Sequence, residues 1–184
     1  MKSFLKIVIG GALVFQVVAI AQEWDYFSKA WFGAASSAPP LSDEETDGAA
    51  ETIRQLLTSM EHFYGTGGDP RFSDRMPAST PLIDEMQADV DYLARNHRVQ
   101  VPTLQRFELL EVRPLDEERI EVRTRELWGV RTLWSVQGSE AEPFRVQVVY
   151  GKYLVVRDRS VWRVHAWEPV ESPSSRTGSA PGGM

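Results

Sequence analysis

The hydrophobic pattern of this sequence changes its period near Val99, and this change constrains the fold more than any other feature. Before Val99, apolar residues recur every three to four positions, as Ile53, Leu56 and Leu57 do, which is the repeat of an amphipathic helix. After it, apolar and polar residues alternate, which is the repeat of a strand with one buried face. Helices followed by strands predict an α+β domain in which amphipathic helices pack on an antiparallel sheet.

Two helices are predicted before the change of period. The first begins at the capping pattern SDEE of 42–45 and ends at the glycine-rich stretch 65–68. A loop that contains prolines follows. The second helix starts at Thr80-Pro81, with Thr80 as its cap and Pro81 at the first helical position, and it continues to about His97.

Strands are predicted over most of the remaining domain. They cover roughly 103–112, 119–137, 143–156 and 160–170. A bend is expected in the second of them at Gly129, and the last two are joined by a turn of hairpin length that contains Asp158. The expected product is a sheet of about four strands that curls over the helices.

The first 32 residues are interpreted as a membrane anchor or a signal helix. The stretch 7–21 is apolar except for Gln16, and it spans about 22 Å as a helix, which is less than the ~30 Å of a hydrocarbon layer. Lys2 and Lys6 lie at its start. The positive-inside rule places these lysines in the cytoplasm and everything after the stretch outside the cytoplasmic membrane.

Two fates of this leader stay open. The motif AIA at 19–21 satisfies the small-x-small rule of signal peptidase, and cleavage there releases a soluble exported domain. Against cleavage, aromatic residues follow on or beside one stripe of a continued helix: Trp24, Phe27, Trp31 and Phe32. Such a stripe suits the headgroup layer of a membrane, although the same aromatics could pack on the folded domain. We favour a retained single-pass anchor, with the domain on the extracytoplasmic, periplasmic side.

Composition narrows the classes of function. A flexible linker, 33–42, and a disordered tail, 171–184, are expected on either side of a domain at 43–170, because both segments are rich in small residues and proline. The chain has a net charge of −6 and no cluster of cationic residues, which argues against nucleic acid as a partner. The chain has no cysteine, which excludes disulfides, a thiolate nucleophile and a zinc–thiolate site.

A family resemblance appears at the end of the domain. The segment FRVQVVYGKYLVVRDRSVWRVHAWEPV contains Y-x-V-x-R at 153–157, a polar turn, and W-x-V at 162–164. It resembles the ending of the nuclear-transport-factor-two-like, or cystatin-like cone, superfamily. The segment RIEVRTRELW at 119–128 is similar to the preceding strand in the intermembrane-space domains of chloroplast-division proteins and related bacterial membrane-anchored domains. The resemblance covers roughly 43–170 and implies a strongly curved, cone-like sheet.

The superfamily includes isomerases, polyketide cyclases, secretion scaffolds and domains without catalysis, so the fold does not decide the function. In enzymes of this kind, a buried Asp or His acts as a base beside a Tyr or a protonated acid. The residues weighed for such roles are His62, Tyr64, Asp69, Asp74, Asp84, Glu85 and His165. We expect His62 at the surface, and alternation places His165 opposite Trp162 and Val164. No catalytic, metal or cofactor site is predicted.

The sheet half is rich in aromatic residues. Phe144, Tyr153 and Trp162 are expected in the core, and a candidate partner surface is assigned to three tryptophans: Trp128, Trp134 and Trp167. The sequence therefore favours a non-catalytic, membrane-tethered interaction module, an accessory subunit with a protein partner in the envelope. The alternative is a small-molecule binder or an isomerase-like or cyclase-like enzyme. A buried polar residue in an open pocket favours that alternative, whereas a filled cone favours the module.

Overall fold

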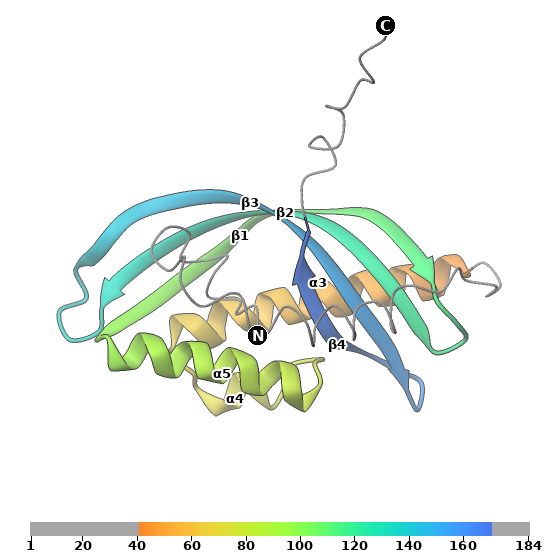
Figure 1. Ribbon diagram of the computed structural model, residues 1–184, viewed down its shortest axis with the longest axis horizontal. Helices are drawn as coiled ribbons and strands as arrows, with labels where there is room; N and C mark the ends of the chain where they lie inside the picture. The colour runs from red at the N-terminus through yellow and green to blue at the C-terminus, as the bar shows by residue number, and fades with distance from the viewer. Residues whose placement is uncertain (1–40, 171–184) are drawn as a thin grey trace, which may run out of the picture.

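A computed structural model describes residues 41–170 (Figure 1). Helices come first and strands second, as the change of period predicts. The elements are α3 (Asp43–Gly65), α4 (Pro70–Ser73), α5 (Thr80–Arg95), β1 (Arg98–Pro114), β2 (Arg119–Trp134), β3 (Glu140–Asp158) and β4 (Val161–Pro169). The predicted anchor at 1–32, with its aromatic stripe, and the tail at 171–184 lie outside the described residues. Between residues 41 and 170, no helix has both the length and the apolar character needed to span a membrane.

The strands form one antiparallel sheet in the order β1-β2-β3-β4, so the expected number and direction of strands are confirmed. The sheet is open and arches over α3 and α5, which lie on the same side of it (Figure 1). The pairing of β1 with β2 shifts register at Leu104/Arg106 and again at Leu109/Glu111. Such bulges increase the local bend and twist of a strand, and they contribute to the arch.

The start of α3 follows the predicted capping box, whereas the cap of α5 is Ser79 and not the predicted Thr80. At α3, the Ser42 side chain accepts a hydrogen bond from the Glu45 amide at 3.2 Å, and the Glu45 carboxylate accepts one from the Ser42 amide at 3.1 Å. Gly67 and Gly68 follow α3 with φ of 73° and 90°, a region that only glycine adopts freely. At the start of α5, Ser79 donates its hydroxyl to the His165 carbonyl at 3.1 Å, which joins the helix to β4.

The core lies between the helices and the face of the sheet that they cover, which we call the inner face. It contains Ile53, Leu56, Leu57, Phe63, Met86, Ile120, Val122, Tyr153, Val155 and Val164, among others. Tyr153 is fully buried, as expected, and Trp162 packs partly buried against this cluster. Side chains from α3, α5 and the middle strands therefore pack together on the inner side of the arch.

Several local expectations are wrong. β1 begins at Arg98 rather than near Thr103, and the proline-containing loop holds the short helix α4. Phe144 was expected in the core but is 49% exposed. The reason is that β4 pairs only with Gly151–Asp158 of β3, and Phe144 lies on the other half of that strand, on the face away from the helices.

Candidate functional site

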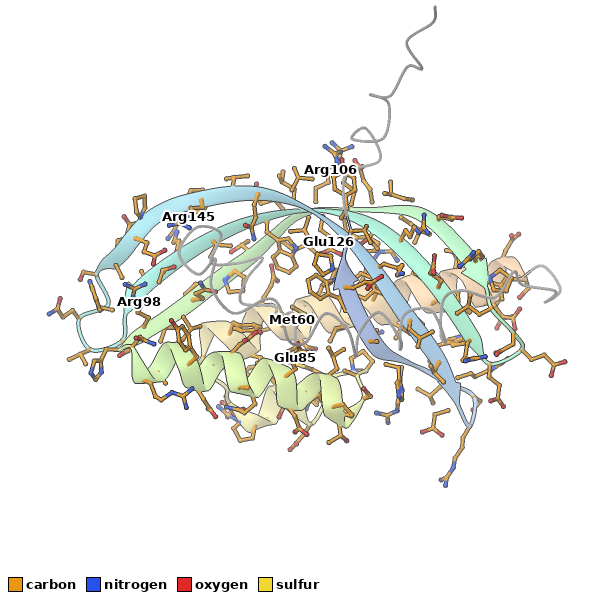
Figure 2. All side chains as sticks on the ribbon, in the orientation of Figure 1. Met60, Glu85, Arg98, Arg106, Glu126 and Arg145 are labelled. Carbon is orange, nitrogen blue, oxygen red and sulfur yellow. The ribbon has the colours of Figure 1, made fainter. Side chains whose placement is uncertain are left out.

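The middle of β2 places a carboxylate on the inner face. Ile120, Val122 and Trp128 alternate along β2 with their side chains in the core, and Glu126 occupies the same parity. Glu126 is 2% exposed. Figure 2 shows it on the inside of the arch, above Met60 of α3, whereas Arg106 lies on the outside. Glu126 is not among the residues weighed from the sequence, although its alternation with Val122 along the strand is a signal that could have indicated its burial.

Glu126 accepts hydrogen bonds from side chains on two strands. Thr124 donates its hydroxyl at 2.6 Å and Trp128 donates its indole N–H at 2.9 Å, both from β2. Tyr153 of β3 donates its phenolic O–H at 2.6 Å. We call these four residues the inner polar cluster. Because every donor is neutral, the cluster satisfies the carboxylate by hydrogen bonding and not by an ion pair.

Burial dominates the electrostatics of this cluster. Desolvation raises the pKa of Glu126, although the hydrogen bonds from Thr124, Tyr153 and Trp128 act in the opposite direction. The pKa of Tyr153 is raised well above its usual range, mainly by burial and then by the neighbouring Glu126 charge. A buried charge without a cation is costly, so the three donors are what make the ionised carboxylate tolerable.

The surroundings of the inner polar cluster are tightly packed. A Cβ on Gly151 of β3 would come within 2.7 Å of the Tyr153 ring and 3.0 Å of the Trp167 indole nitrogen. The rings of Tyr153 and Trp167 lie 6.4 Å apart between centroids. A general acid or base must reach its substrate by a hydrogen bond, and here the oxygens of Glu126 already accept bonds from protein donors. The oxygens of Glu126 are thus held by hydrogen bonds from the protein itself, in closely packed surroundings.

The candidate partner surface of three tryptophans is corrected by the structure. Trp128 and Trp167 are only 5% and 7% exposed, whereas Trp134 is 37% exposed. Trp128 shares the inward parity of Glu126 and bonds to it. Trp134, near the end of β2, lies under the Arg98 guanidinium, 5.4 Å from its ring centroid. Only Trp134 of the three retains the exposure that a contact residue needs.

A bulge explains the burial of Trp167. Strict alternation from the buried Val164 puts Trp167 on the opposite side, together with Arg163 and His165. In the structure, Val155 pairs with Val164 and the adjacent Leu154 pairs with Ala166, which leaves His165 as an extra residue in β4. One extra residue reverses the facing of every later side chain. Trp167 therefore turns inward while His165 stays exposed.

The residues weighed for acid–base chemistry are not brought together. His62 is exposed, as expected, and stacks on a ring of α4 at 5.2 Å. Asp84 is exposed on α5 but lies beyond the first turn of that helix, which contains no acidic residue. Tyr64 is buried between the helices and donates to Asp89 at 3.3 Å. Among residues 41–170, no group of three or more His, Asp or Glu residues is arranged to hold a metal ion.

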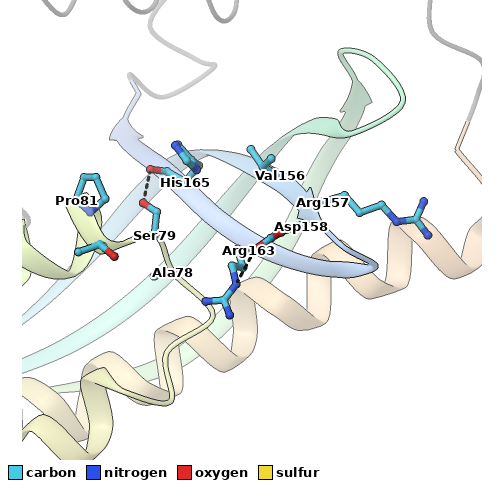
Figure 3. Close-up of a pocket in the computed structure, with 9 residues that line it drawn as sticks. Ala78, Ser79, Pro81, Val156, Arg157, Asp158, Arg163 and His165 are labelled. Carbon is cyan, nitrogen blue, oxygen red and sulfur yellow. Dashed lines mark hydrogen bonds and ion pairs between the residues drawn. The ribbon is translucent and has the colours of Figure 1, made fainter.

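A groove of about 540 Å³ lies between the start of α5 and the hairpin of β3 and β4 (Figure 3). Arg157, Arg163 and His165 line it, which are residue types that bind anions. However, Arg157 bonds to Glu45 at 3.4 Å, and Arg163 lies 4.0 Å from Asp158. In Figure 3 the two guanidinium groups point away from each other. The groove therefore lacks a convergent cationic centre.

The face of the sheet away from the helices, which we call the outer face, carries exposed apolar residues. Three alternate positions of β3, Phe144, Val146 and Val148, are 49%, 54% and 46% exposed, and we call them the outer strip. They lie on the half of β3 that β4 leaves unpaired, since β4 pairs with Gly151–Asp158. Sequence alternation predicts the strand, but it does not show which of its faces the helices cover.

Charged side chains surround the outer strip. Arg125 donates to Glu108 at 3.0 Å, and Arg106 lies 2.6 Å from the same carboxylate. These residues, together with Glu126, Leu127 and Val148, line a small pocket of about 60 Å³. An apolar centre with a polar rim is the usual composition of a protein-contact surface.

The fold is similar to that of a domain of known structure. The intermembrane space region of chloroplast protein ARC6 matches with a TM-score of 0.57 and 14% identity, over 73% of this chain and all (100%) of that one. Aln2 from a Streptomyces species and a protein from Catenulispora Acidiphila both match at a TM-score of 0.42, which is too low to carry an argument. Their identities are 14% and 9%, over 72% and 68% of this chain and 93% and 94% of theirs.

No protein-family model and no curated protein sequence matches the chain. The likeness to the ARC6 region is at low identity, so it concerns the fold alone. The described domain is accordingly an α+β domain whose open, four-stranded antiparallel sheet packs on helices in an arrangement similar to that region.

Proposed function

We propose that the domain at 43–170 is a non-catalytic interaction module that binds a protein neighbour through the outer strip. The observation that carries this proposal is the exposure of Phe144, Val146 and Val148 at about half of each side chain on consecutive outward positions. Exposed apolar groups that lie in one row are costly in water unless another surface covers them. The exposed Trp134 stays a predicted contact residue of the same module.

We further propose that the chain is a single-pass protein of the cytoplasmic membrane, with this domain on its extracytoplasmic side. The apolar stretch 7–21, the lysines before it and the aromatic residues after it support this topology. The ARC6 domain of similar fold comes from an intermembrane space. In this proposal the module is an accessory subunit of a membrane complex, needs no cofactor, and belongs to the cystatin-like cone superfamily.

The tether and the partner surface are tested separately. Intact-mass measurement of the mature chain is expected to give the full sequence from Met1, and carbonate washing is expected to leave the chain in the membrane. A mature chain that begins at Gln22 refutes the anchor but leaves the partner surface untouched.

The partner surface has a matched control within the chain. Val146 and Val161 are 54% and 55% exposed, but only Val146 belongs to the outer strip. We expect Val146→Asp to remove a specific protein from affinity purifications of gently solubilised membranes, because a charge is introduced at the apolar centre. Val161→Asp is expected to retain that protein. If both variants retain every protein that the natural chain retains, the outer strip is not the contact.

One observation favours the alternative of a small-molecule binder or isomerase-like enzyme. A buried carboxylate of raised pKa beside a tyrosine, as in Glu126 and Tyr153, is the pairing such enzymes use. The two functions differ in whether a small molecule can reach Glu126. A small molecule that co-purifies with the natural chain, and is lost from Glu126→Gln while the melting temperature is kept, supports the enzyme-like function in place of the module.

A further inference from the structure

One half of β3 has an open edge. β4 pairs with Gly151–Asp158, and within residues 41–170 no strand pairs with the outer edge of 143–149. The carbonyl of Tyr150 accepts a hydrogen bond from the Val170 amide at 2.9 Å, from the side of β4. The main-chain groups of Tyr150 therefore point away from β2. An edge with free N–H and C=O groups is a template for another strand.

The direction of the Tyr150 carbonyl shows which residues of that edge have main-chain groups that can pair with another strand. Main-chain groups alternate in direction along a strand of an antiparallel sheet, so those of Val148, Val146 and Phe144 also point to the open edge. These are the residues of the outer strip. The positions with free main-chain groups are thus also the positions with exposed apolar side chains.

The outer strip is self-complementary about Val146. Turning the strand by a twofold axis at this residue exchanges Phe144 with Val148, so that an apolar residue meets an apolar residue at each position. On the other face, the same operation places Arg145 opposite the neutral Gln147. No like charges meet at these positions. The alternation of side chains and main-chain groups is therefore compatible with a second, antiparallel copy of the same segment.

We propose that two copies of this chain pair edge to edge through 144–148 of β3, with Val146 on the twofold axis, to form one continuous sheet. This inference rests on the proposed function and deepens it. The side chains of both strips stay on the outer face of the joined sheet, where Phe144 of one copy lies beside Val148 of the other. The two strips merge, and the apolar surface offered to a protein neighbour is wider than one copy provides.

The absence of native cysteine makes a direct test possible in the full chain. Residues opposite each other in a hydrogen-bonded antiparallel pair have Cα atoms about 5.5 Å apart, which suits a disulfide. Val146→Cys, in the full chain in mild detergent, is expected to form a covalent dimer on gentle oxidation about tenfold faster than Val161→Cys, because pairing raises the effective concentration of the thiols. Sedimentation of the cysteine-free chain is expected to give twice the chain mass.

The register is tested by two further variants. Phe144→Cys and Val148→Cys are each expected to cross-link slowly alone and rapidly when mixed, since each faces the other across the axis. Equal rates for Val146→Cys and Val161→Cys overturn the proposed pairing. Rapid self-cross-linking of Phe144→Cys alone also overturns it, because it requires another register.

The two proposals fail in different ways. If Val146→Asp still loses its protein partner while no dimer is found, the pairing is wrong and the interaction module stands. If the dimer forms and its loss in Val146→Asp leaves every other co-purified protein in place, the pairing stands and the heterologous partner is wrong.

Discussion

The two faces of the sheet distribute polarity in opposite ways at its centre. On the inner face, Glu126 is 2% exposed and lies among core residues. On the outer face, Val146 and Val148 are about half exposed to water. From residue type alone, Glu126 would be expected on the exposed face, and Val146 and Val148 on the buried one. The difference shows that a buried polar group can be structural when its hydrogen bonds are made. The row of exposed apolar groups is the basis of the proposed contact surface.

The hydrogen bonds explain why the inner face tolerates a carboxylate. Thr124 and Trp128 reach Glu126 along β2, and Tyr153 reaches it from β3, so the cluster ties the two long central strands together. In the outer strip, the Arg131 guanidinium lies over the Phe144 ring at 5.9 Å from its centroid, and the side chains of the strip point away from the helices. The packed core and its hydrogen bonds therefore lie on the inner face, whereas the contact with other molecules that we propose lies on the outer one.

The largest effect is expected when the carboxylate of Glu126 is removed from the inner face. Glu126→Ala leaves three buried donors without their acceptor and creates a cavity, so the free energy of unfolding is expected to fall by about 3–4 kcal/mol. In the monomer, Val146→Asp is expected to change it by less than about 0.5 kcal/mol, because the position is exposed in a single copy. Urea denaturation measures both. Equal effects on stability abolish the distinction between the faces.

A smaller effect is expected from the donor on β3. Tyr153→Phe removes only the hydroxyl that lies 2.6 Å from Glu126, and the expected loss is about 1.5–3 kcal/mol because the acceptor can be charged. Tyr92 of α5 is 37% exposed, so Tyr92→Phe serves as the control and is expected to be nearly neutral. A neutral Tyr153→Phe shows that the cross-strand hydrogen bond contributes nothing net to stability.

The smallest effect is a dependence on pH. Burial raises the pKa of Glu126 above its ordinary value of 4.5, so the folded state holds this proton more tightly than the unfolded state does. Stability contributed by the protonated group is fully present below pH 4.5 and is lost as pH rises through the folded pKa. The free energy of unfolding of the natural chain minus that of Glu126→Gln is thus expected to decrease from pH 4.5 upwards. A difference that rises with pH contradicts the raised pKa.

Much of the architecture could be predicted from local signals. The capping pattern at Ser42 and the Thr80-Pro81 start fix the two long helices, because these signals act within a few residues. Alternation likewise gives the strands. The periods of the hydrophobic pattern therefore predict the order of helices and strands, although they do not predict how these elements pack.

The site was less predictable, because it depends on long-range pairing. The extra residue His165 reverses the facing of Trp167, and no sequence signal marks such a bulge. Phe144 is exposed because β4 pairs only with Gly151–Asp158 and does not reach the part of β3 that contains Phe144. The length of this pairing cannot be read from the sequence. Glu126 could have been found, since it alternates with Val122 and Trp128 along a strand whose inner face is buried.

The most direct test of the account is photo-cross-linking from the outer strip in intact membranes. A photoreactive amino acid at position 146 is expected to capture a protein neighbour or a second copy, whereas the same group at position 161, of nearly equal exposure (54% and 55% for the natural valines), is expected to capture neither above background. Capture at 146 that disappears when Phe144→Asp is added supports the strip as the contact. Equal capture from both positions, or none from either, contradicts the claim that this domain works through its outer face.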